Sequence, residues 1–153
     1  MSNTLEEALQ TAILREAAAY ELYTSAARMV APGPTQDMLF DLAAQERGHR
    51  RRLEGILAKG SLAQLTAAQQ ERVLDLRLTD HLVSAPLGPN AGLQDILIVA
   101  GKREAASHAF YTDMATVAED AQLRTLFETL ANEELKHKQA IEKLYEEMFY
   151  PEN

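Results

Sequence analysis

Residues 130–137 read Leu-Ala-Asn-Glu-Glu-Leu-Lys-His, and residues 42–49 read Leu-Ala-Ala-Gln-Glu-Arg-Gly-His. Both stretches follow the pattern Leu-Ala-x-x-Glu-x-x-His, and they lie 88 residues apart. Residues three apart on an α-helix share one face, so each stretch would direct a carboxylate and an imidazole the same way. Two such pairs could bind two metal ions.

The same offset relates a longer part of the chain without a gap. It aligns Arg15-Glu16 with Arg103-Glu104, and Tyr23 with Tyr111. An internal repeat of this kind indicates two copies of one helical unit, packed around a shared axis.

The composition favours helix. Ala, Leu and Glu are frequent, only 7 Gly and 5 Pro occur, and 46% of the 153 residues are hydrophobic, so we expect an all-α fold with one core. We predict a single domain over residues 1–153, with one helical hairpin at 3–60, a crossover at 61–92 and a second hairpin at 93–149. A crossover of this length suits an antiparallel four-helix bundle.

Several other classes of protein are disfavoured. The net charge of −8 argues against a nucleic-acid partner, and we interpret the basic triplet at residues 50–52 as solvated helix surface. The chain has no Cys, which excludes disulfides and thiolate-bound metal centres. No basic-then-apolar leader opens the sequence, and no apolar run approaches the roughly 20 residues that span a bilayer. We therefore expect a cytoplasmic protein without a membrane partner.

Local signals predict where the four helices begin and end, at about residues 4–30, 35–59, 93–118 and 121–148. Ala31-Pro32-Gly33-Pro34 would end the first helix and reverse the chain. Asp120 is a good N-cap for the fourth helix, whose apolar stripe we expect to run as far as Met148.

Six charged or titratable residues occupy positions on the inward stripes of these helices. They are Glu16, Glu46, His49, Glu104, Glu134 and His137. Counted from the turns near residues 32 and 120, all six lie roughly 21–26 Å along their helices at about 1.5 Å per residue. Four carboxylates and two imidazoles would therefore meet in one layer of the core.

This layer predicts a two-metal site. Four buried carboxylates without a cation would repel one another and take up protons, whereas two divalent ions would cancel their charge. Oxygen and imidazole donors suit iron, manganese or zinc, and bridging carboxylates with open positions favour two iron ions. The alternative is a metal-free structural bundle, because a single Glu-x-x-His is usually a surface pair.

Other residues near the ligands have two possible roles. Tyr23 and Tyr111 each follow a ligand glutamate by seven residues, where a phenol could hydrogen-bond a carboxylate or relay an electron, or simply fill the core. Tyr20 and His108, which the repeat also pairs, could be extra ligands or core residues. Glu133 has no histidine three residues on, so we interpret it as supporting a ligand from outside the site, or as solvated.

On these motifs, and on the stretches 74–83 and 102–113, the sequence resembles the rubrerythrin branch of the ferritin-like di-iron carboxylate family. The resemblance implies a ferritin-like bundle, in a protein that acts against oxidative stress. Its two irons would be oxidised by hydrogen peroxide or oxygen and reduced by an electron carrier. A homodimer is also expected for a bundle of this kind.

Two departures from the rubrerythrin pattern, and one from that of bacterioferritin, refine this expectation. Without Cys the chain has no rubredoxin-type iron module, so an external donor protein must supply electrons. Ser107 stands where rubrerythrins typically have a further glutamate, which leaves a symmetric ligand set similar to that of bacterioferritin. Arg47 stands where bacterioferritin has its haem methionine, so we expect no haem. We predict a peroxide-reducing di-iron oxidoreductase; the alternative is a ferroxidase or iron-binding protein that uses oxygen.

Overall fold

The computed structural model describes residues 4–58 and 91–151. These residues form α1 (Thr4–Arg28), α2 (Pro34–Ala58), α4 (Leu93–Val117) and α5 (Ala121–Phe149), with no strand among them. The predicted all-α four-helix fold is confirmed, and each helix begins and ends within two residues of its expected position. Most of the predicted crossover at 61–92 lies outside the described residues.

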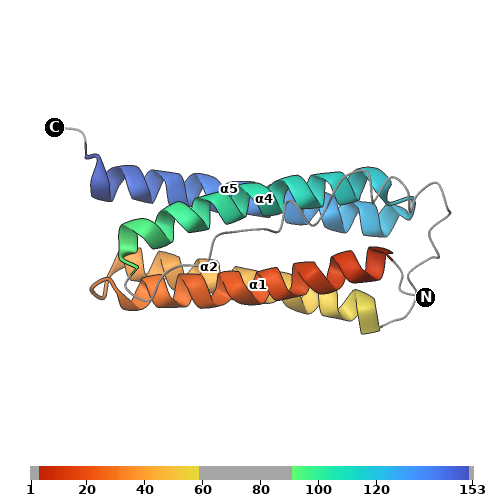
Figure 1. Ribbon diagram of the computed structural model, residues 1–153, viewed down its shortest axis with the longest axis horizontal. Helices are drawn as coiled ribbons and strands as arrows, with labels where there is room; N and C mark the ends of the chain where they lie inside the picture. Colours follow the sequence, from red (N-terminus) through yellow and green to blue (C-terminus); the bar gives the residue numbers. More distant parts are fainter. Residues whose placement is uncertain (1–3, 59–90, 152–153) are drawn as a thin grey trace.

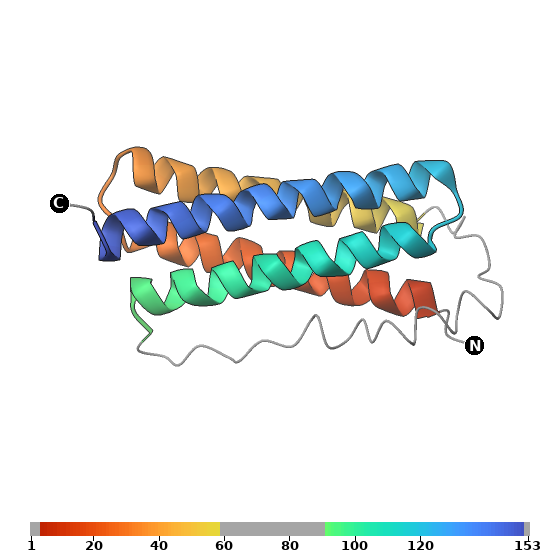
Figure 2. The same cartoon turned by 90° about the horizontal axis from the view of Figure 1, so that it is seen from above.

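The four helices form two antiparallel hairpins that lie side by side along the long axis of the bundle (Figures 1 and 2). Helix α1 pairs with α2, and α4 pairs with α5. Helix α1 also contacts α4, so the equivalent first helices of the two hairpins are neighbours. The repeat predicted this packing of two similar hairpins, and the arrangement is consistent with the ferritin-like four-helix bundle that the resemblance implies.

The turns follow from local chemistry. Gly33 has a φ of 154°, which L side chains rarely adopt, and Pro34 takes the first position of α2, where its missing N–H costs nothing. The amide of Gln36 closes this turn by donating to the carbonyl oxygens of Ala27 and Val30. At the other hairpin, Asp120 accepts a hydrogen bond of 2.9 Å from the backbone N–H of Leu123, which confirms the predicted cap of α5.

Two apolar clusters lie on either side of one polar layer. The first cluster contains Leu9, Leu53, Phe110 and Phe127, and the second contains Tyr23, Leu39, Leu97 and Ile141. On every helix the predicted ligand positions fall between the residues of the first cluster and those of the second. The hydrophobic cores therefore enclose the polar layer near the middle of the bundle.

The stripe predicted for the fourth helix was wrong at its last member. Leu144 is buried, but Met148 is 39% exposed. The end of α5 extends beyond the start of α4 in Figures 1 and 2, so the last turn has less of the bundle to pack against. Among the described helices, none combines the length and apolar character that crossing a membrane requires.

Candidate metal centre

The bundle brings all six predicted ligand residues into one buried layer. Helix α1 provides Glu16, α2 provides Glu46 and His49, α4 provides Glu104, and α5 provides Glu134 and His137. None of the six is more than 3% exposed. The expectation that distant glutamates and histidines meet in the core therefore agrees with the structure.

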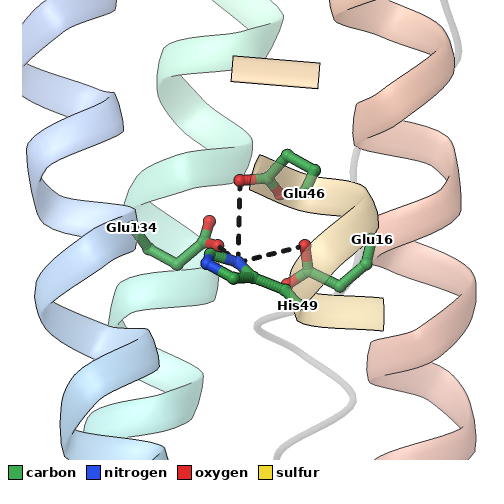
Figure 3. Close-up of side chains that lie close together, drawn as sticks. All are labelled: Glu16, Glu46, His49 and Glu134. Carbon is green, nitrogen blue, oxygen red and sulfur yellow. Dashed lines mark ion pairs between the residues drawn. The ribbon is translucent and has the colours of Figure 1, made fainter. Parts of the chain in front are cut away.

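The six side chains form two overlapping groups that could each hold a metal ion. One group contains Glu16, Glu46, His49 and Glu134, and Figure 3 shows these four side chains converging. The other contains Glu46, Glu104, Glu134 and His137. Within each group, one ligand atom from every residue lies within 4.8 Å of the others. Glu46 and Glu134 belong to both groups, as bridging carboxylates between two neighbouring ions would.

Both histidines direct the same ring nitrogen toward the carboxylates. His49 Nδ1 lies 2.6 Å from Glu134 Oε1 and 3.5 Å from Glu16 Oε2. His137 Nδ1 lies 2.6 Å from Glu46 Oε1 and 3.7 Å from Glu104 Oε1. The two rings stack with their centroids 5.7 Å apart. Each Nδ1 atom is thus placed as the metal-binding nitrogen.

The other ring nitrogen of each histidine has a partner outside the carboxylate layer. His49 Nε2 contacts Glu133 Oε2, and His137 Nε2 lies 2.8 Å from Gln45 Oε1. An oxygen acceptor at Nε2 favours the tautomer with its proton there, which leaves the Nδ1 lone pair free for a metal. Of the two interpretations of Glu133, the supporting role agrees with the structure. The sequence reasoning missed Gln45, although the repeat pairs it with Glu133.

Two buried tyrosines bind the ligand glutamates of the opposite hairpin. Tyr23 on α1 donates a hydrogen bond of 2.5 Å to Glu104 on α4, and Tyr111 on α4 donates one of 2.6 Å to Glu16 on α1. Both tyrosines are 1% exposed. The phenols hence connect the two hairpins at the level of the site and orient one carboxylate each.

The carboxylates strongly perturb one another. Burial, together with the charges of Glu16 and Glu104, raises the pKa of Glu46 and of Glu134 well above the ordinary value. Burial alone would also raise the pKa of Glu16, but the neighbouring His49 holds it below the ordinary value. The layer therefore concentrates negative charge, which favours the protonated form of Glu46 and Glu134 in the metal-free protein.

Several buried atoms in this layer lack a hydrogen-bond partner within the described structure. They include Glu16 Oε2, Glu104 Oε2, Glu134 Oε1 and His49 Nδ1. Although Glu134 Oε1 lies close to His49 Nδ1, neither atom has a hydrogen bond of acceptable geometry. Buried polar atoms are rarely left unsatisfied, and a bound cation would satisfy all four. The donor set, which has oxygen and nitrogen but no sulfur, fits iron, manganese or zinc.

The remaining residues singled out in the sequence lie outside both groups. His108 Nδ1 is 2.8 Å from the backbone oxygen of Ala131, so its contact is with the adjacent helix. The guanidinium of Arg47 lies 6.0 Å from the ring centroid of Tyr20, which makes these two residues a separate cation–π pair. Ser107 is partly buried and belongs to neither ligand group.

Comparison with known proteins finds one family-model match, which lies in the second hairpin. Residues 95–153 match the family model for rubrerythrin. Searches among curated proteins and among solved structures found no match to the chain. The matched region contains Glu104, Glu134 and His137, and the first hairpin presents the corresponding set by the internal repeat. The resemblance seen in the sequence is thereby confirmed: the chain carries a rubrerythrin-family domain match at residues 95–153, consistent with a ferritin-like di-iron family.

Proposed function

We propose that this chain is a di-iron oxidoreductase that reduces hydrogen peroxide with electrons from a separate donor protein. The observation that carries the proposal is the pair of overlapping ligand groups, which share Glu46 and Glu134. Each group provides three carboxylates and one imidazole, and these donors would hold a redox-active metal such as iron, which can exchange electrons with a small oxidant. The rubrerythrin-family match supports the same class of chemistry.

The residues divide into holding and bridging roles. Glu16 and His49 would hold one ion and Glu104 and His137 the other, while Glu46 and Glu134 would bridge them. Two bound ferrous ions would supply the two electrons that, with two protons, convert one hydrogen peroxide into two water molecules.

The packing around the ligand layer shields the site from solvent. Apolar clusters lie on both sides of the ligand layer, and every ligand residue is buried. Electrostatic interactions are stronger in such an environment, and ligand side chains packed in it keep their positions. The phenols of Tyr23 and Tyr111 would hold Glu104 and Glu16 in place as the charge of the site changes.

A ferroxidase that binds ferrous iron and uses oxygen is the second candidate. It is favoured by the symmetry of the ligand set, because each hairpin contributes two glutamates and one histidine. Ser107 adds no further carboxylate next to Glu104, so nothing in the described ligand set distinguishes the two iron positions by number of carboxylates.

The oxidant preference tests the proposal. Protein loaded with ferrous iron under anaerobic conditions would be mixed with one equivalent of hydrogen peroxide or with oxygen, and ferric absorbance followed by stopped flow. We expect faster oxidation by peroxide. A faster reaction with oxygen, together with uptake well beyond two irons per chain, would support the ferroxidase instead. No oxidation by either would contradict both functions.

A pair of variants connects that reaction to the site. Glu134→Ala removes a bridging carboxylate, so we expect the fast ferric signal to disappear. Glu142→Gln changes a glutamate on the same helix that is half exposed and paired with Lys138, so it should leave the reaction unchanged. Elemental analysis of protein purified without air would establish which metal the chain acquires.

The source of electrons is also part of the proposal. The given sequence has no cysteine that could ligate an iron centre for electron relay, so we assign the supply of electrons to a separate donor protein. The homodimer and the cytoplasmic location stay predictions from the sequence.

A further inference from the structure

The two histidines differ in what their outer nitrogen contacts. His49 Nε2 contacts a carboxylate oxygen of Glu133, whereas His137 Nε2 lies 2.8 Å from the amide oxygen of Gln45. Gln45 and Glu133 are themselves 88 residues apart, so they occupy the same position in the two copies of the repeat. An otherwise symmetric site thus has a charged acceptor behind one histidine and a neutral acceptor behind the other.

Each acceptor is held in place by a further contact. Arg52 Nη1 lies 3.7 Å from Glu133 Oε1, the carboxylate oxygen opposite the one that contacts His49, so a cation stands beside this carboxylate. Gln45 donates a hydrogen bond of 2.8 Å from its Nε2 to Asp41, which turns its oxygen toward His137. Both histidines therefore meet an oxygen, but a carboxylate beside a cation stands behind His49 and an amide beside a carboxylate stands behind His137.

This difference matters because the outer partner of a histidine tunes its strength as a metal ligand. A carboxylate accepting the Nε2 proton makes the opposite nitrogen more basic than a neutral amide oxygen does, since hydrogen bonds to charged acceptors are stronger. Both Nδ1 atoms face the carboxylate layer, so the effect acts directly on the nitrogens placed to bind metal.

We propose that the two metal positions are inequivalent, with the position that contains His49 binding a divalent ion more tightly and filling first. This inference rests on the two-metal site of the proposed function. Mutation of the group behind a ligand histidine typically changes metal affinity by roughly 10–100-fold. We expect a separation of about that size between the two binding steps, with Glu133 and Gln45 acting as positioning residues.

Titration of the metal-free protein with cobalt(II), followed by its visible spectrum in competition with a chelator, measures both steps. The wild type should bind two ions in two separated steps. Glu133→Gln should weaken the first step by roughly 10–100-fold and bring the two together. Gln45→Glu should strengthen the second binding step, so that both ions bind with an affinity close to that of the first step in the wild type.

The double variant Gln45→Glu with Glu133→Gln is the decisive control. It exchanges the two acceptors at constant composition and charge, so the two steps should separate again in the reverse order. Cobalt anomalous scattering from crystals grown with one ion per chain would locate the tighter position, near His49 in the wild type and near His137 in the exchanged variant. Glu128→Gln removes the same charge from an exposed position on α5 and should leave both steps unchanged.

The outcomes separate this inference from the proposed function. Two ions bound in equivalent steps, or a separation that Glu133→Gln leaves unchanged, would overturn the inequivalence and leave the di-iron function standing. A chain that binds no cobalt would overturn the metal site itself, and both proposals with it.

Discussion

The phenol of Tyr111 donates a hydrogen bond of 2.6 Å to Glu16, although the two residues lie 95 positions apart in the chain. The repeat generates the reciprocal bond from Tyr23 to Glu104. Each bond crosses from one hairpin to the other within the ligand layer. The tyrosines therefore stabilise the packing of the two hairpins and also orient two of the candidate ligands.

Loss of one of these phenols should therefore destabilise the protein. Tyr111→Phe removes the donor to a buried carboxylate, and we expect the free energy of unfolding to fall by about 1.5–3 kcal/mol, the usual worth of a hydrogen bond to a charged group. Urea unfolding of the metal-free protein measures this. Tyr145→Phe is the matched control, because its hydroxyl accepts an exposed hydrogen bond from Gln94 and belongs to neither ligand group. Equal losses in the two variants would show that the phenol of Tyr111 has no special role.

The metal-free protein should lose stability as the pH rises. The pKa of Glu46 and of Glu134 is raised in the folded state, so the folded protein binds more protons than the unfolded chain above the ordinary value of 4.5. Their stabilising contribution is complete below that value and is lost as the pH rises through the folded pKa. His49 acts in the same direction, since the pKa of its imidazole is raised above 6.5. The pKa of Glu16 is lowered, so its contribution is lost only as the pH falls below 4.5.

Chemical unfolding in the presence of a chelator, from about pH 5 to about pH 8, measures how the free energy of unfolding depends on pH. Replacing both bridging residues, with Glu46→Gln and Glu134→Gln, should weaken this dependence and stabilise the metal-free protein at neutral pH by removing buried charge. A metal-free wild type that becomes more stable across this range would contradict the prediction.

Metal binding should offset the destabilisation that the buried, ionised carboxylates cause. Ions that bind only the folded state stabilise it by about 2.7 kcal/mol when their free concentration is 100 times the dissociation constant. We expect manganese(II) or zinc(II) to raise the melting temperature, with about two ions bound per chain. Glu46→Ala should abolish most of this rise. If the metal-loaded and metal-free proteins had the same melting temperature, metal binding would not explain why these carboxylates are buried.

The apolar clusters should be sensitive to truncation. Leu9 is 0% exposed in the first cluster, while Leu14, on the same helix, is 72% exposed. Leu9→Ala should cost about 2–5 kcal/mol through lost burial and an internal cavity. Leu14→Ala should change stability by less than about 0.5 kcal/mol. Thermal or urea unfolding of the two variants gives the comparison, and similar losses would place Leu9 outside the core.

The start of α5 should depend on its cap. Asp120→Ala removes the acceptor for the Leu123 backbone N–H and should cost about 0.5–2 kcal/mol. Asp120→Asn keeps a side-chain oxygen at the same place and should retain most of the stability. An Asn variant as unstable as the Ala variant, measured by urea unfolding, would show that the charge rather than the hydrogen bond matters.

Much of this architecture could be read from residue order because the signals are local. A helix repeats every 3.6 residues, so the positions of Glu46 and His49 within an apolar stripe already specify a shared face. The Pro-Gly turn before α2 and the Asp120 cap are likewise set by neighbouring residues. These signals located the four helices of the described residues, and with the internal repeat they placed the six candidate ligands at one level.

The sequence by itself thus determined the helices, their pairing into two hairpins and the composition of the buried layer. Only the tertiary structure decided that each phenol reaches the glutamate of the other hairpin, that Glu133 and Gln45 stand behind opposite histidines, and that Met148 leaves the core. The physical reason is that helical periodicity gives the face on which a side chain lies. Which atom it meets depends on how packed helices are rotated and offset against one another.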